Sequence, residues 1–212
     1  VRVNGAPVRM DSPHDAIDHH IGMVHQHFQL VPVLTVAENI VLGHEPTRGR
    51  GLLDIDRAAT EVGELGKRFG LEVDPRATVE DLPVGMQQRV EILRALYRKA
   101  DVLILDEPTA VLTPQETDHL LEVLRGLAAE GVAIVFITHK LREVLAVADR
   151  VTVMRGGRVV GSTTPAETDQ AGLAEMMVGR SVVLRVAKTE ARPEAGVLEI
   201  RDLHVRDDRD RP

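Results

Sequence analysis

The sequence predicts an α/β fold with a parallel sheet at its core. Residues 102–105 (VLIL) form a continuous apolar run rather than an alternating one, which is typical of a parallel strand covered on both faces. Residues 132–139 (VAIVFITH) predict a second buried strand, and residues 150–154 a third. Helices expected between them complete a succession of strand, helix, strand, helix and strand, which indicates a parallel sheet with right-handed crossovers.

Short elements are expected in the first part of the chain: a hairpin over 1–10, a helix over 13–20, a strand over 21–24 and a helix over 35–43. The hairpin is indicated by apolar and polar residues that alternate around a turn at Asn4 and Gly5. Ser12 followed by proline is a typical helix start. Thr35 with Glu38 three residues later predicts a capping box.

Two longer helices are expected over 54–69 and 85–99. Asp54 is suited to cap the first helix and Gly70 to end it. Apolar residues at helical spacing predict the second, and they place Gly85 at its N-terminus. Free backbone N–H groups at such an end can bind an anion. A glycine that merely begins a helix is the alternative interpretation.

The core helix between the first two strands is expected to begin at Thr113 and Pro114. After the core, a helix is expected over 141–148, a hairpin that turns at two glycines, and a helix over 170–180. Residues 181–196 are rich in Ala, Arg, Glu and Pro without periodicity, which predicts a linker. Alternation resumes at 197–204 as in a first strand, so a new unit is expected to begin within 197–212.

Composition narrows the classes of function. The 212 residues carry a net charge of −7, which provides no positive field for a nucleic-acid backbone. One Tyr, three Phe and no Trp disfavour stacking on single-stranded bases, so we expect no nucleic-acid partner. The absence of cysteine excludes thiolate chemistry. No run approaches the roughly 18 apolar residues of a membrane span, so a membrane role would need a separate partner.

Two adjacent carboxylates, Asp106 and Glu107, follow the apolar strand at 102–105. Ligands of open α/β sheets bind at the carboxyl ends of the strands. One carboxylate there can hold a magnesium ion while its neighbour orients a water for phosphoryl transfer. A solvated strand end is the alternative interpretation. Pro108 should present both acids on a loop, and His139, after the next strand, is a candidate phosphate contact at the same edge.

With these motifs in this order, the sequence resembles the ATP-binding subunits of ABC transporters. The resemblance covers nearly all of residues 1–206 and is strongest to bacterial importers of simple sugars and nucleosides, in which two ATPase domains are fused. It implies an α/β, P-loop NTPase-like parallel sheet core with an inserted helical subdomain at about 35–98. It also implies ATP and Mg²⁺ as ligands.

The resemblance assigns a role to each motif. Gln26 in GMVHQHF would be the Q-loop glutamine, which in the family meets the magnesium ion or the attacking water. Asp106 would face the magnesium ion and Glu107 would be the catalytic carboxylate of the Walker B strand. His139 would be the switch histidine that contacts the γ-phosphate. The segment in the signature position, expected to bind nucleotide, consists of Leu82, Pro83, Val84, Gly85, Met86 and Gln87.

Two departures from the family pattern matter. The usual signature is Leu-Ser-Gly-Gly-Gln, whereas Pro83 offers neither a hydroxyl nor an N–H. A hydrogen bond to a charged group contributes about 1.5 to 3 kcal/mol, so we expect one good and one impaired ATP site. In addition, no G-x-x-x-x-G-K-[ST] loop occurs. Family order places that loop before residue 1, so we expect residues 1–180 to be an ATPase domain without its Walker A portion. Natural degeneration is the competing explanation.

The resemblance implies the ATP-hydrolysing subunit of a nucleoside or simple-sugar importer, peripheral at the cytoplasmic face of the cell membrane; the fragment by itself is expected to be inactive. Its expected partners are integral membrane permease subunits, the second ATPase domain of the same full-length chain and, indirectly, an extracytoplasmic substrate-binding protein. A soluble ABC ATPase in translation or DNA repair and a non-catalytic regulatory domain remain alternatives. The sequence VGMQQRVEILRALYR favours a nucleoside as the transported solute.

Overall fold

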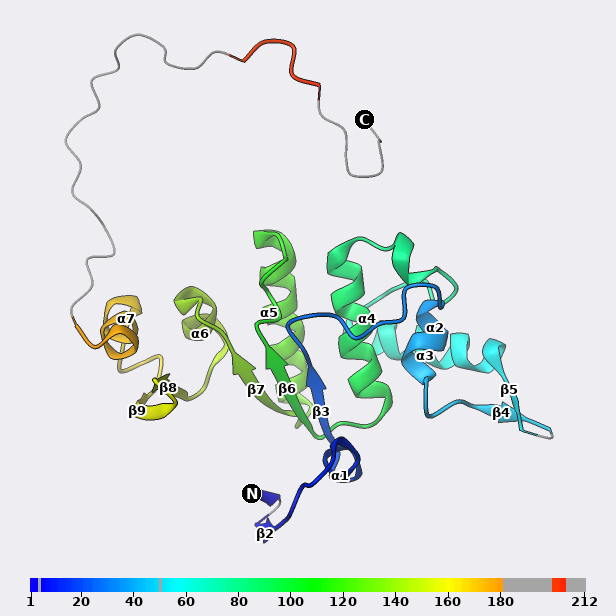
Figure 1. Cartoon of the computed structure of the whole chain (residues 1–212), viewed down its shortest axis with the longest axis horizontal. Coiled ribbons are helices and arrows are strands. Elements are labelled where there is room, and N and C mark those ends of the chain that lie inside the picture. Colours follow the sequence, from blue (N-terminus) through cyan, green and yellow to red (C-terminus); the bar gives the residue numbers. More distant parts are fainter. Residues whose placement is uncertain (4, 50, 181–199, 205–212) are drawn as a thin grey trace.

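A parallel sheet forms the centre of the computed structural model, which describes residues 1–3, 5–49, 51–180 and 200–204. The strand order is β3-β6-β7, and both neighbouring pairs are parallel (Figure 1). The strands are β3 (Ile21–Val24), β6 (Val102–Asp106) and β7 (Ala133–Ile137). Val102 pairs with Ile21 on one side and with Ala133 on the other, so the three strands are in register. The parallel sheet expected from the apolar runs is confirmed.

One face of this sheet is buried beneath helices. Leu103 and Leu105 of β6 are fully buried and pack in the same cluster as Leu124 of α5 (Pro114–Ala129), which connects β6 to β7. On the opposite face Met23 and Val135 are 42% and 48% exposed. The expectation that the strand is covered on both faces is therefore wrong for the described residues. Alternate residues of β6 are only half-buried, because no described helix packs over that face.

A group of helices is inserted between β3 and β6. Figure 1 shows these helices beside the sheet, on the side away from β8 and β9. Its helices are α2 (Val36–Val41), α3 (Ile55–Phe69), the single-turn η1 (Val79–Asp81) and α4 (Val84–Tyr97), and its hairpin consists of β4 (Thr47–Arg48) and β5 (Leu52–Leu53). Ile40, Val62 and Leu93 are fully buried in one cluster with the sheet residues, so the core is continuous.

The caps that the sequence predicts are present in these helices. The Thr35 hydroxyl accepts from the backbone N–H of Glu38, and the Glu38 side chain accepts from Thr35, which completes the capping box of α2. Asp54 caps α3, and Gly70 ends it in the left-handed conformation at φ 66°. That conformation favours glycine because it has no Cβ to clash with the backbone.

Beyond β7 the chain forms a smaller second cluster. Its elements are α6 (Leu141–Val147), β8 (Val151–Arg155), β9 (Arg158–Thr163) and α7 (Gln170–Val178). Val151, Val153 and Leu173 are buried within it. Among the described residues β8 pairs with β9 in an antiparallel hairpin and not with the parallel sheet. The expectation that the third strand of the succession would continue the sheet is thus wrong, and β3 supplies the third strand instead.

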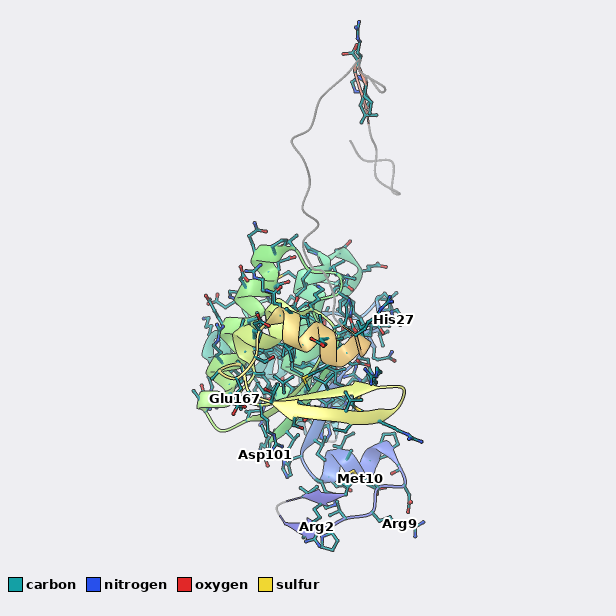
Figure 2. The ribbon with its side chains drawn as sticks, turned by 90° about the vertical axis from the view of Figure 1, so that its left-hand side faces the viewer. Arg2, Arg9, Met10, His27, Asp101 and Glu167 are labelled. Carbon is teal, nitrogen blue, oxygen red and sulfur yellow. The ribbon has the colours of Figure 1, made fainter. Side chains whose placement is uncertain are left out.

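The N-terminal segment lies at one end of the molecule, where Figure 2 labels Arg2, Arg9 and Met10. It contains the expected hairpin, reduced to the antiparallel pair β1 (Arg2–Val3) and β2 (Ala6–Pro7), and the short helix α1 (Pro13–Asp18). At the other end of the chain, the expected linker at 181–196 lies outside the described residues. Of the strand expected at 197–204, residues 200–204 are described and have no regular secondary structure.

In the described part of the chain, none of the helices combines the length and the apolar character that crossing a bilayer requires.

Asn39 of α2 holds the loop that precedes its own helix. The side chain is fully buried, and its Oδ1 accepts from the backbone N–H of Val31 at 2.7 Å. Its Nδ2 donates to the carbonyl oxygens of Val31, Leu34 and Thr35 at 3.0 to 3.3 Å. A buried amide with all these partners fixes the loop between the sheet and the inserted helices.

We expect Asn39→Ala to lower the free energy of unfolding by about 2 kcal/mol or more, because the partly buried N–H of Val31 loses its acceptor. Denaturant unfolding followed by circular dichroism measures the change. Gln115→Ala is the matched control, since it removes an exposed amide from α5. Equal stabilities of the two variants would contradict this account of Asn39.

A second prediction concerns Tyr97, the one tyrosine of the chain. Its hydroxyl donates to Oε2 of Glu61 at 2.7 Å and so joins α4 to α3. Burial, and then this hydrogen bond, raise the pKa of Tyr97 to about 12. The unfolded phenol titrates near about 10, so the stability that this group contributes is complete below about pH 10 and is lost between about 10 and 12.

Phenolate absorbance should therefore give a midpoint near 12 for the folded chain. Glu61→Gln should move the midpoint down, because the negative charge beside the phenol is lost. Glu64→Gln, an exposed change on the same helix, should leave it in place. A wild-type midpoint at the ordinary value for tyrosine would refute the contact.

Candidate active site at the carboxyl edge of the sheet

The sheet topology brings the candidate residues from three strands to one edge. Gln26 follows β3, Asp106 ends β6 with Glu107 after it, and His139 follows β7. Because the strands are parallel neighbours, their carboxyl ends share that edge. In Figure 2 Asp101, before β6, lies toward the N-terminal segment, and His27, beyond β3, lies away from it. The edge therefore faces away from the N-terminal segment.

Glu107 and His139 are in direct contact. Oε1 of Glu107 lies 2.7 Å from Nδ1 of His139, and the two side chains are 23% and 66% exposed. Glu107 has φ 48°, a left-handed conformation that is rare for residues other than glycine. Its backbone N–H donates to the Ile137 carbonyl at 2.9 Å and so fastens this turn to β7. Such strain persists only where surrounding contacts hold it, and it clusters at functional sites.

Asp106 differs from its neighbour in its surroundings. It is the last residue of β6 and pairs with Ile137 in the ladder, so the expectation that both acids lie on a loop holds only for Glu107. The regular pairing of β7 extends to this position, which keeps Asp106 within the strand. Side chains alternate along a strand, so Asp106 shares the half-buried face of β6 with Ile104. The Asp106 carboxylate thus belongs to a strand, whereas the Glu107 carboxylate belongs to the turn that follows it.

Gln26 is exposed in the bend after β3, and α4 holds the loop that carries it. Three residues on, the backbone N–H of Gln29 donates to Oε1 of Glu91 at 2.6 Å, and Nη1 of Arg94 donates to the Gln29 carbonyl at 2.9 Å. Glu91 is 4% exposed, and burial raises its pKa, although the Gln29 N–H opposes this effect. Two residues of one helix therefore fix both backbone groups of Gln29.

The predicted signature segment begins α4, as expected for Gly85. Pro83 is the N-cap and provides no side-chain hydrogen bond to the helix. Nε2 of Gln87 donates to the Leu82 carbonyl at 2.9 Å. A Cβ at Gly85 would collide with the carboxylate of Glu116, which belongs to the first turn of α5. Within the described residues, no hydrogen bond or ion pair joins residues 82–87 to Glu107 or His139.

The donor atoms at the sheet edge fit a magnesium ion. Carboxylate and amide oxygens are the ligands that Mg²⁺ accepts, and it is commonly bound by one or two carboxylates together with substrate phosphates and water. Among the described residues, no group of three or more His, Cys, Asp or Glu side chains could hold a metal by itself. Asp106 and Gln26 carry oxygen atoms of the kinds that such an ion accepts.

A groove of about 570 Å³ lies between α5 and α6. Lys140 and Glu143 contribute to its lining, and Glu107 and His139 do not. The groove is thus a feature separate from the contact of these two residues.

Sequence reasoning missed the residues that support the candidates: Glu91, Arg94, Lys140 and Glu143. A signal was present for two of them, because Glu91 and Glu143 are single acids within apolar helical stretches, where an unpaired charge would be costly. Gln29 and Thr109, which these acids bind, are however distant from them in the sequence, and no spacing rule identifies such partners.

The chain is similar in sequence to known proteins. The sequence profile described as "ABC transporter" matches residues 1–110. The nucleoside import ATP-binding protein NupA of Lactococcus lactis is 50% identical over 99% of this chain and 41% of its own length. The glucose import ATP-binding protein TsgD13 of Haloferax volcanii is 48% identical over 99% of this chain and 43% of its own length. The chain thus spans about two fifths of the length of these curated relatives.

A solved structure supports the fold. CbiO1 from Clostridium perfringens, part of the ABC transporter complex CbiONQ, superposes with a TM-score of 0.63 at 29% identity over 76% of this chain and 64% of its own. The family profile covers more than half of the 212 residues and includes β3, β6 and the Asp106-Glu107 pair. The chain belongs to the ABC transporter family.

Proposed function

We propose that the full-length protein containing this chain hydrolyses ATP as the ATP-binding subunit of an ABC importer for a nucleoside or a simple sugar. The observation that carries the proposal is the contact of Glu107 with His139 at the edge where Asp106 and Gln26 also lie. Relatives named for nucleoside, guanosine and glucose import support the importer class over translation or DNA repair.

The proposed chemistry assigns one task to each side chain. The Glu107 carboxylate orients the attacking water, and His139 fixes that carboxylate and donates toward the charge of the terminal phosphate. Asp106 and Gln26 would hold the magnesium ion. Bound Mg²⁺ would neutralise charge on the phosphate oxygens. Positioning and charge stabilisation account for most catalysis of phosphoryl transfer, and side chains held on a sheet edge can contribute to both.

The domain division is part of the proposal. Residues 1–180 would be an ATPase domain without its Walker A portion, with residues 35–98 as the helical subdomain, 181–196 as a linker and 197–212 as the start of a second ATPase domain. The uncovered sheet face at Met23, Val135 and Ile137 supports a further element of the full-length protein packing there. The length of the relatives agrees with this division.

The proposed partners follow from the same class. Integral membrane permease subunits would bind the ATPase domains at the cytoplasmic face of the membrane, and a substrate-binding protein would deliver the solute from outside. ATP would bring two ATPase domains together, with the 82–87 segment of one facing the Walker B strand of the other. Pulldown of a membrane subunit with the full-length protein, and radiolabelled uptake of nucleosides and sugars in cells lacking it, test partner and substrate.

We expect Glu107→Gln in the full-length protein to lower ATP hydrolysis by about a hundredfold or more, because a neutral amide cannot serve as the base. Nucleotide binding should persist, since the side chain keeps its size and one acceptor. Phosphate release measures hydrolysis and equilibrium dialysis measures binding. Glu122→Gln, an exposed change on α5, is the control. If Glu107→Gln hydrolyses ATP as fast as the wild type, the proposed role of that carboxylate is wrong.

Pro83→Ser should raise turnover of the complete transporter. The new hydroxyl and N–H add donors for a phosphate. The energy of one hydrogen bond to a charged group corresponds to a change in rate of about tenfold or more. Pro83→Ala separates the two effects, since it restores the N–H without the hydroxyl. If the serine variant and the wild type hydrolyse ATP at the same rate, position 83 does not impair an ATP site.

A further inference from the structure

A buried carboxylate is hydrogen-bonded to the loops that carry Glu107 and His139. Glu143, on α6, is 6% exposed. Its Oε2 accepts from the hydroxyl of Thr109 at 2.7 Å and from that of Thr138 at 3.4 Å, and its Oε1 lies 3.4 Å from Nζ of Lys140. A carboxylate loses much solvation energy when buried, and it is tolerated here because each oxygen has a partner.

The partners of Glu143 belong to the two loops that carry Glu107 and His139. Thr109 is two residues beyond Glu107 and is 1% exposed. Its hydroxyl donates to Glu143, and its carbonyl accepts from Nζ of Lys140 at 2.6 Å. On the other loop, the Thr138 hydroxyl accepts from the backbone N–H of Lys140 at 3.0 Å. The hydroxyl and the carbonyl of Thr109 are thereby tied to the segment around His139.

This connection acts where the backbone is under strain. Glu107 is held at φ 48°, with its N–H bonded to Ile137 and its carbonyl accepting from Ala110 at 3.1 Å. The strained turn has one anchor before it, in the sheet, and the Thr109 contacts are the anchor after it. If the second anchor is removed, the backbone can relax toward an ordinary conformation and carry the Glu107 carboxylate away from His139.

We propose that Glu143 is a positioning residue for ATP hydrolysis. It holds Thr109, and through Thr109 the turn that aims the Glu107 carboxylate at His139 and at the attacking water. The proposal rests on the proposed function, because it assigns Glu143 a part in the same reaction. Glu143 itself is buried behind the loops and touches no reacting atom. It should therefore affect the rate of the chemical step and leave nucleotide binding unchanged.

The test uses the full-length protein assembled with its membrane subunits, and it measures kcat and KM for ATP. We expect Glu143→Ala to lower kcat about tenfold or more, since small displacements of positioned groups carry large rate penalties, with KM within about twofold of the wild type. Glu143→Gln keeps an acceptor for the Thr109 hydroxyl, so its kcat should fall less than that of Glu143→Ala. Glu122→Gln, which removes an exposed carboxylate from α5, is the matched control.

Thr109 provides an independent variant pair should Glu143→Ala fold poorly. Thr109→Val removes the hydroxyl at nearly constant volume and should reproduce the fall in kcat, whereas Thr109→Ser keeps the donor and should retain most of the turnover. The double variant Glu143→Ala with Thr109→Val should be no slower than the slower single variant, because both changes break the same link.

The possible results separate this proposal from the function on which it rests. If the wild type hydrolyses ATP, Glu107→Gln does not, and both Glu143→Ala and Thr109→Val turn over like the wild type, the positioning role is wrong and the ATPase function stands. Equal rates for Thr109→Val and Thr109→Ser would also overturn it. Failure of the wild-type assembly to hydrolyse ATP would remove the proposed function itself.

Discussion

Parallel pairing of β3, β6 and β7 is the constraint on which the rest of the structure depends. Each strand ends at the same edge, so a glutamine, two acids and a histidine that are widely separated in sequence arrive there together. Antiparallel pairing of any one strand would send its loop to the opposite edge. The ladder also continues past β6 through the N–H of Glu107, which joins the strained turn to the sheet itself.

Buried polar side chains of helices hold the loops at this edge. Asn39 fixes the loop before α2, Glu91 with Arg94 fixes the backbone of Gln29, and Glu143 fixes Thr109. In each case a helix side chain binds atoms of a loop. Backbone groups that are buried in a loop need such partners, and the result is a loop with one defined conformation.

The two faces of the sheet are buried to different extents. Helices cover the face of Leu103 and Leu105, whereas Met23, Val135 and Ile137 on the other face are each more than 40% exposed. Apolar strand residues on an open face favour association with a further element. Under the proposed domain division, a further element of the full-length protein would pack on this face.

The sequence by itself determined the local structure: continuous apolar runs, capping boxes and glycine stops depend on neighbouring residues, so β6, α2 and α3 could be predicted, including the start of α2 and both ends of α3. It also placed Glu107 and His139 after successive strands. Only the tertiary structure decided that β8 leaves the sheet, that one sheet face stays open, and that Glu143 and Lys140 hold Thr109. These outcomes depend on contacts between distant segments, for which the spacing of residues along the chain carries no signal.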